Sequence, residues 1–234
     1  MLESLRNTGL NARLTPEVYD RYAEEVTKRE EEWKKSVEYL RICNISFMGG
    51  IDDICIPTPV CQQDWTNIIY DYRECRVVDT AKDVPEGYKT IAMGGTVPCA
   101  LMSIIGFYKP SRFTLSEIGK VLVENGYRTE NKGTLWIAMD KVPELVYGIQ
   151  TEMLNHLLEL CQQVSLCHPV MALVPAGWLH RFPNMPSNEC VIVWRLEEKK
   201  VIVTTTSSHS TIELDLYDFL RNVKRAWAFQ PPIE

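Results

Sequence analysis

Apolar residues recur at helical spacing directly after a pair of glycines near the middle of the chain. The glycines permit a tight turn, Thr96 is a favourable N-cap, and Pro98 suits a first helical turn, where its missing N–H costs little. The apolar positions that follow lie on one helical face: Leu101, Ile104, Ile105 and Tyr108. The pattern predicts a loop over Gly94 and Gly95 that leads into a buried helix. A helix N-terminus of this kind stabilises a thiolate or an anion.

A second helical pattern occupies the N-terminal region. Thr15 and Pro16 form a helix start signal, and a charged face lies opposite the apolar residues that follow up to Leu40. Those apolar residues repeat at steps of three, four and seven: Val18, Tyr22, Val26, Trp33 and Val37. We therefore expect one amphipathic helix over 15–40 with its apolar face buried. It either packs on its own domain or serves as the arm of a homodimer.

The remaining pattern changes from helices to strands along the chain. Short strands are expected near 41–47 and 65–78, and a capping box of Thr114 and Glu117 starts a helix that ends at Gly126. Further helices are expected from 133–134 to Gly148 and from Thr151 onward. Later segments predict strands over 169–174, 190–196, 201–206 and 225–229, with a hairpin tip at 197–200 and a short helix capped by Asp215. Helices followed by an antiparallel sheet predict an α+β fold in two parts.

Composition narrows the possible functions. The chain has 234 residues with 45% hydrophobic and 24% charged residues, which is typical of one folded domain with or without an appendage. A net charge of −6 argues against nucleic acid or an anionic membrane as partner. No apolar run approaches the about 18 residues of a membrane span, and the N-terminus lacks a signal-peptide core. We expect a cytoplasmic protein in which the eight cysteines are free thiols.

Three segments between about Gly94 and Phe229 carry a family pattern. The first reads Thr96-Val97-Pro98-Cys99-Ala100-Leu101, where the family opens its catalytic helix with Cys-Gly-Pro-x-x-Leu. The second runs from Leu115-Ser116-Glu117-Ile118 to Gly126 and on to Tyr147-Gly148-Ile149. The third reads Asn188-Glu189-Cys190-Val191-Ile192-Val193, a hairpin and Thr204-Thr205-Thr206, against Asn-His-x-Val-Val-Val, a hairpin and Asn-Asp-Pro.

In these segments the chain resembles papain-like cysteine peptidases, and more closely the bacteriocin-processing peptidases that cut after a double glycine and their stand-alone relatives. The resemblance implies a papain-like α+β domain over 91–234, and 1–90 is then an N-terminal helix and extension outside the family pattern. The family's nucleophilic Cys, its His base and its orienting Asp or Asn correspond to Thr96, Glu189 and Thr205. A threonine is a poor nucleophile without a strong base, and a carboxylate is a weaker base than an imidazole. The family's oxyanion-hole glutamine falls near Thr90 and is absent in that register.

Other residues offer replacements for the lost catalytic groups. Cys99 is one helical turn beyond Thr96 and is either a substitute nucleophile or a structural thiol, and Cys190 is expected to pack in the sheet. His180 and His209 lie in loops beside the former His and Asp positions, where they either flank the cleft or occupy surface turns. We expect no cofactor and no metal, and the acidic pair at 52–53 indicates a turn.

These observations favour a catalytically degenerate papain-like homologue, a pseudoenzyme that binds a peptide or a carrier-bound acyl ligand. The predicted ligand-binding residues are Gly95, Thr96, Trp178, His180 and Glu189. Thr96, Glu189 and Thr205 should meet at one cleft, where Glu189 favours a cationic ligand group or pairs with an internal cation such as Arg181. The alternative is an active peptidase or amide-forming acyltransferase with Cys99 or Thr96 as nucleophile. A third possibility is an interaction protein that acts through helix 15–40.

Overall fold

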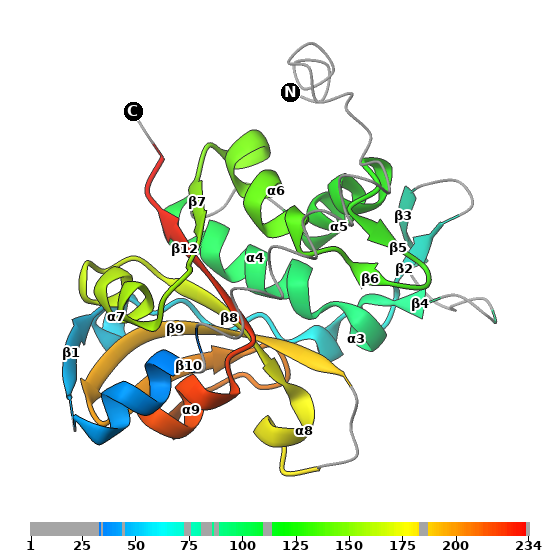
Figure 1. Cartoon of the computed structure of the whole chain (residues 1–234). Helices are drawn as coiled ribbons and strands as arrows, with labels where there is room; N and C mark the ends of the chain where they lie inside the picture. The colour runs from blue at the N-terminus through cyan, green and yellow to red at the C-terminus, as the bar shows by residue number, and fades with distance from the viewer. Residues whose placement is uncertain are drawn as a thin grey trace.

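The protein has an α+β fold organised around one antiparallel sheet (Figure 1). The structure is a computed structural model that describes residues 33, 35–43, 45–72, 76–80, 86, 89–109, 114–182 and 187–232. The sheet order is β11-β10-β9-β8-β12-β7, and β1 pairs with the far end of β9. The strands are β1 (Phe47–Gly50), β7 (Gln150–Met153), β8 (Val170–Pro175), β9 (Asn188–Glu198), β10 (Lys200–Thr205), β11 (Thr211–Asp215) and β12 (Arg225–Gln230).

Alternate residues of β9 divide the core between the two faces of the sheet, because successive side chains of a strand point to opposite sides. Cys190, Ile192 and Trp194 belong to a cluster with α4 (Thr96–Tyr108), α5 (Leu115–Glu124) and α6 (Ile137–Tyr147). Val191 and Val193 belong to a second cluster with α7 (Leu157–Ser165) and α9 (Leu216–Asn222). The sheet is therefore covered by helices on both faces (Figure 1).

The central helix forms as the sequence predicts, with one change at its start. The short helix α3 (Ile91–Gly94) precedes it, and Gly95 rather than Thr96 is the N-cap. A Cβ atom on Gly95 would lie 2.4 Å from Ile91 Cγ2 and 2.5 Å from the Ile91 carbonyl oxygen. Glycine is therefore needed at this position by close packing, and Thr96 becomes the first helical residue.

Several boundary signals are confirmed. The capping box of Thr114 and Glu117 is formed at the start of α5. Gly148 ends α6 in the left-handed conformation, with φ at 69°, and Asp215 caps α9 by accepting a hydrogen bond from the Asp218 amide. The hairpin between β9 and β10 turns at Lys199, as expected.

Two predicted helix starts are wrong. Gly133–Thr134 forms strand β6 against β5 (Arg128–Thr129), and α6 begins only at Ile137. Thr151 lies in strand β7, which pairs with β12 at the edge of the main sheet. In both cases hydrogen bonding between strands outweighs the local helical pattern, and for Thr151 the partner strand β12 is distant in sequence.

The N-terminal part packs against the rest of the chain where it is described. Residues 33 and 35–42 are helical, whereas residues 15–32 of the predicted helix lie outside the described residues. Trp33 and Val37 are buried, and the Trp33 indole donates to the Leu220 carbonyl oxygen of α9 at 3.1 Å. Burial of this face on its own domain is confirmed for these residues, while a homodimer through 15–40 remains a prediction.

The segment before residue 90 forms short elements that approach the site. The strand expected near 41–47 is wrong over most of its length, because residues 41–42 continue the helix and β1 begins only at Phe47. The range 65–78 contains a hairpin of β2 (Ile68–Asp71) and β3 (Arg76–Asp79), with β4 (Lys89–Thr90) on the other edge of β2. Two single turns, η1 (Asp53–Cys55) and η2 (Gln62–Asp64), precede the hairpin. Because β1 pairs with β9, the sheet crosses the domain boundary predicted near residue 90.

No helix in the described ranges has both the length and the apolar character needed to span a bilayer.

Candidate functional site

Thr96 and Glu189, far apart in sequence, are joined by hydrogen bonds at the start of α4. The Thr96 hydroxyl oxygen accepts a hydrogen bond from the Cys190 amide at 2.8 Å and lies 2.8 Å from the Thr206 hydroxyl oxygen. Thr206 donates a longer hydrogen bond to Glu189 Oε1 at 3.5 Å. The first turn of α4, the start of β9 and the end of β10 therefore meet, and the expected convergence of Thr96 with Glu189 is confirmed.

The third expected residue, Thr205, is linked to Glu189 through Ser207, which donates to Glu189 Oε1 at 2.8 Å. Thr205 is buried and its hydroxyl lies 3.2 Å from Ser207 Oγ, whereas Thr206 is the residue that contacts Thr96. The ladder between β9 and β10 contains a register shift between Ile202 and Val203. Because of this shift, the position of a threonine in the sequence of the hairpin does not predict whether Thr205 or Thr206 contacts α4.

Glu189 is 5% exposed and has polar partners within the chain. Its Oε2 atom lies 2.5 Å from His180 Nε2, and its Oε1 atom accepts a hydrogen bond from Ser207 Oγ at 2.8 Å. Arg181, the internal cation suggested by the sequence, is exposed. The internal partner of Glu189 is therefore His180, and this contact stabilises a carboxylate that would be costly to bury alone.

The arrangement differs from a hydrolytic triad. In a triad, the imidazole uses one nitrogen for the nucleophile and the other for the carboxylate. Here His180 Nε2 faces both Glu189 and Ser207, the second at 3.5 Å, and Ser207 donates to the carboxylate. These groups form a structural polar cluster, in which the serine hydroxyl proton is already committed.

The Thr96 hydroxyl has two hydrogen-bond partners, the Cys190 amide and the Thr206 hydroxyl. A threonine hydroxyl has one proton and two lone pairs. A Thr96 lone pair receives the Cys190 amide, and either hydroxyl can donate the hydrogen bond between Thr96 and Thr206. Among these hydrogen-bonded groups the Glu189 carboxylate is linked to Thr96 through Thr206 and not directly.

The candidate thiols are buried in the core. Cys99 has no exposed surface and packs in a cluster with Ile68, Tyr70 and Leu115. Burial raises the pKa of the Cys99 thiol far above its usual value, and it raises the pKa of Cys190 to about 12. Both thiols are protonated near neutral pH, so neither supplies the thiolate that nucleophilic catalysis needs.

A pocket of about 500 Å³ lies beside Thr96, and we call it the Thr96 pocket. Its wall combines apolar side chains with charged ones: Val97, Leu135, Trp136, Lys89, Arg128, Glu130 and Lys132. Of the five predicted ligand-binding residues, Thr96 lines this pocket and Gly95, Trp178, His180 and Glu189 do not. Gly95 is buried under Ile91, and the Trp178 indole instead donates to Asp218 Oδ2 at 3.1 Å and packs against Phe219 of α9.

The charge of the Thr96 pocket is opposite to the expected one. Its wall carries three cationic side chains and one carboxylate, and the Glu189 carboxylate is not part of it. Arg128 is positioned by hydrogen bonds to the Tyr72 hydroxyl at 3.1 Å and to Thr134 Oγ1 at 2.8 Å, with its guanidinium 4.0 Å from the Tyr70 ring centroid. This wall favours an anionic group, whereas the cationic ligand group expected at Glu189 stays a prediction.

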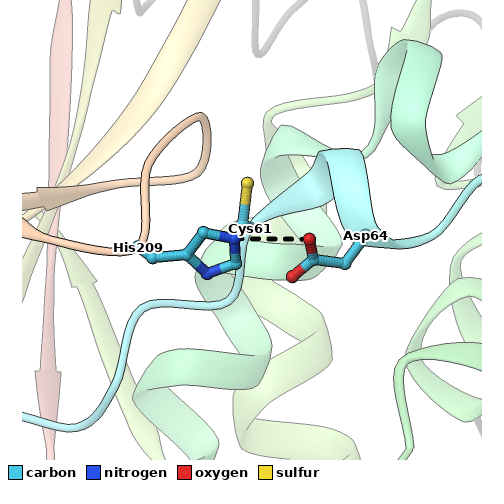
Figure 2. Close-up of side chains that lie close together, drawn as sticks. All are labelled: Cys61, Asp64 and His209. Atoms are coloured by element: carbon cyan, nitrogen blue, oxygen red, sulfur yellow. Dashed lines mark ion pairs between the residues drawn. The ribbon is translucent and has the colours of Figure 1, made fainter.

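The turn η2 contributes residues that the sequence patterns did not identify. The Gln62 amide donates to the Thr206 carbonyl oxygen at 2.8 Å, which places this turn beside the threonine that contacts Thr96. Cys61 and Asp64 on the same turn approach His209 of the β10–β11 loop (Figure 2). Residues 61 and 209 are too far apart in sequence for any spacing motif to connect them. The acidic residue Asp53 is in a turn, as expected, and pairs with Arg195 at 3.0 Å.

Comparison of the chain with models of protein families, with curated proteins and with solved structures found no match.

Proposed function

We propose that this chain is a catalytically inactive, papain-like domain that binds an acidic ligand in the Thr96 pocket, either an extended peptide or a carrier-bound acyl group. One observation carries the proposal. At the position where the resembling peptidases have their nucleophile, the Thr96 hydroxyl is held by the Cys190 amide and Thr206 at the mouth of a pocket of about 500 Å³. Pockets of this size are typical of small-molecule or peptide side-chain sites.

The groups around Thr96 support the proposed lack of catalysis. General-base catalysis contributes roughly 10²–10⁴-fold, and it requires a base within hydrogen-bonding reach of the nucleophile's proton. The nearest carboxylate along the hydrogen-bonded chain is Glu189, which Thr96 reaches only through Thr206. Glu189 is itself paired with His180, so the imidazole stabilises a buried acid instead of activating a hydroxyl.

The walls of the pocket indicate the ligand class. Trp136 and Leu135 offer an apolar surface, and Arg128 and Lys132 place positive charge beside it. Such a combination suits a ligand with an apolar portion and an anionic group, such as the C-terminal carboxylate of a peptide or the phosphate of a carrier arm.

Strand β6 favours the extended peptide among these ligands. Gly133 and Thr134 form this strand and lie on the pocket wall. Strand β6 pairs with β5 in a two-stranded sheet, so within the described residues its second edge has no strand partner. An extended peptide can add to such an edge through main-chain hydrogen bonds.

The experiment compares two lysines by fluorescence anisotropy with labelled peptides that have a free or an amidated C-terminus. Lys132 lies on the pocket wall, whereas Lys120 lies on α5 in a pair with Glu124 and serves as the matched control. We expect Lys132→Gln to weaken binding of the free-carboxylate peptides by about fivefold, the effect of roughly 1 kcal/mol, and Lys120→Gln to leave it unchanged. Equal affinity for free and amidated peptides, or equal effects of the two substitutions, would contradict an anion-binding pocket. A phosphopantetheine competitor then distinguishes the carrier-arm ligand from the peptide.

A further inference from the structure

Three side chains with metal-binding atoms gather outside the Thr96 pocket. One ligand atom each of Cys61, Asp64 and His209 lies within 4.8 Å of the other two. His209 Nε2 is 3.3 Å from Asp64 Oδ1, and Figure 2 shows the imidazole facing that carboxylate with the Cys61 side chain beside them. We propose that these residues form a binding site for a divalent transition-metal ion of the zinc class.

The local backbone explains why Cys61 and Asp64 are neighbours. Cys61 is the N-cap of the 3₁₀ turn η2, and Asp64 is its last residue. A 3₁₀ helix has three residues per turn, so positions i and i+3 lie above one another on the same side. The Asp64 amide also donates to the Cys61 carbonyl oxygen at 3.3 Å, which holds the two residues in this relation.

The third ligand comes from a loop that is attached to the same turn. The Gln62 amide donates to the Thr206 carbonyl oxygen at 2.8 Å, directly before the loop that carries His209. Within that loop the Ser210 amide donates to Ser208 Oγ at 3.2 Å. Hydrogen bonds therefore bring the imidazole to η2 before any ion binds, and such preorganisation reduces the cost of assembling a site.

The ligand set selects the class of metal. A thiolate, an imidazole and a carboxylate suit Zn²⁺ and Co²⁺, whereas Mg²⁺ and Ca²⁺ prefer oxygen ligands only. Tetrahedral coordination at 2.0–2.3 Å places ligand atoms about 3.3–3.8 Å apart. The atoms of His209 and Asp64 are already 3.3 Å apart, and the distances to Cys61 Sγ, which are at most 4.8 Å, need to shorten by no more than about 1.5 Å. Asp64 and His209 have side chains that are 52% and 63% exposed, and they are free to rotate inward toward the buried Cys61.

Charge and access also fit this class of ion. Cys61 loses its thiol proton to solvent when the sulfur binds, and the thiolate with the Asp64 carboxylate then balances the two charges of the metal. Three protein ligands leave one position for water. His209 lies on the wall of a second pocket, of about 560 Å³, and the exposed side chains of His209 and Asp64 are reached directly from solvent.

The test titrates the full, reduced and metal-free chain with Co²⁺ and then with competing Zn²⁺, followed by absorption. We expect visible bands of tetrahedral Co²⁺ with a thiolate charge-transfer band in the near ultraviolet, both displaced by Zn²⁺. Asp64→Asn keeps an exposed polar side chain and should weaken Zn²⁺ binding at least roughly tenfold, as should His209→Ala. The matched controls Asp52→Asn and Cys55→Ser alter exposed residues outside the cluster and should bind as the wild type does.

Several outcomes would overturn the proposal. These are Co²⁺ binding without the thiolate band, equal affinity of Asp64→Asn and Asp52→Asn, or zinc binding only at millimolar concentration. Displacement of bound Zn²⁺ by Mg²⁺ at a similar concentration would also overturn it. If Cys61→Ser is too unstable to purify, the charge-transfer band of the wild type still reports the thiolate. None of these readouts depends on peptide binding, so the metal site and the Thr96 pocket can fail separately.

Discussion

The pair of Glu189 and His180 allows the most quantitative prediction. In Glu189→Gln the carboxylate becomes an amide of nearly the same size, which removes the charge while the space stays filled. The carboxylate is 5% exposed and contacts His180 at 2.5 Å and Ser207 at 2.8 Å. Hydrogen bonds to charged groups contribute about 1.5–3 kcal/mol, but the His180 side chain is 31% exposed and solvent screens part of this energy. We expect a loss of roughly 1–3 kcal/mol in the free energy of unfolding.

The assay is thermal and urea unfolding near neutral pH. For a chain of this length, 1 kcal/mol corresponds to about 2–4 °C in Tm, so Glu189→Gln should lower Tm by roughly 2–12 °C. Glu152→Gln on β7 is the control, because Glu152 is exposed and its variant should unfold as the wild type does. A double-mutant cycle with His180→Gln should give a coupling energy of about 0.5–3 kcal/mol. Stability unchanged by Glu189→Gln, together with no coupling, would show that Glu189 needs no internal partner and would refute the reasoning.

Three further predictions concern the core. Iodoacetamide should label exposed Cys55 and leave Cys99 unreacted in the native chain, and peptide mapping that finds fast labelling of Cys99 would contradict its burial. Burial raises the pKa of Cys161 and Cys190 to about 12. The stability that comes from keeping these thiols protonated should therefore be complete below pH 9.0 and should fall as the pH rises toward about 12. A free energy of unfolding, measured by urea titration, that increases over this pH range would contradict this prediction. Trp33→Ala should lower the free energy of unfolding by about 3–5 kcal/mol, since it removes a buried indole and its hydrogen bond to α9. An unchanged urea midpoint would indicate that the helix that carries Trp33 does not pack on the domain.

Local signals predicted the elements that depend on local chemistry. The apolar face of α4, the capping box of Thr114 and Glu117, and the hairpin at Lys199 each depend on residues close in sequence. The failures at Gly133 and Thr151 share a different cause. Both residues enter strands, and strand pairing supplies hydrogen bonds that no helical periodicity in the sequence reveals.

The candidate site was predictable in part for the same reason. The resembling segments indicated that Thr96 and Glu189 converge, because each is near the start of an element that the patterns identified. They did not indicate Thr206, since the register of β9 against β10 shifts within the hairpin. They left either a ligand cation or an internal cation such as Arg181 as the partner of Glu189, and they did not indicate His180, because the turn that brings His180 to the carboxylate follows from the tertiary fold.

The central claim is that the Thr96 pocket binds a ligand without transforming it. Affinity selection of a peptide library on the purified chain, followed by mass spectrometry, measures retention and chemical change together. We predict that peptides with a free C-terminal carboxylate are retained intact, and that the same masses are recovered from wild type and Thr96→Ala. Cleaved or joined peptides that appear with the wild type and disappear with Thr96→Ala would contradict the account, as would a library of which no member is retained.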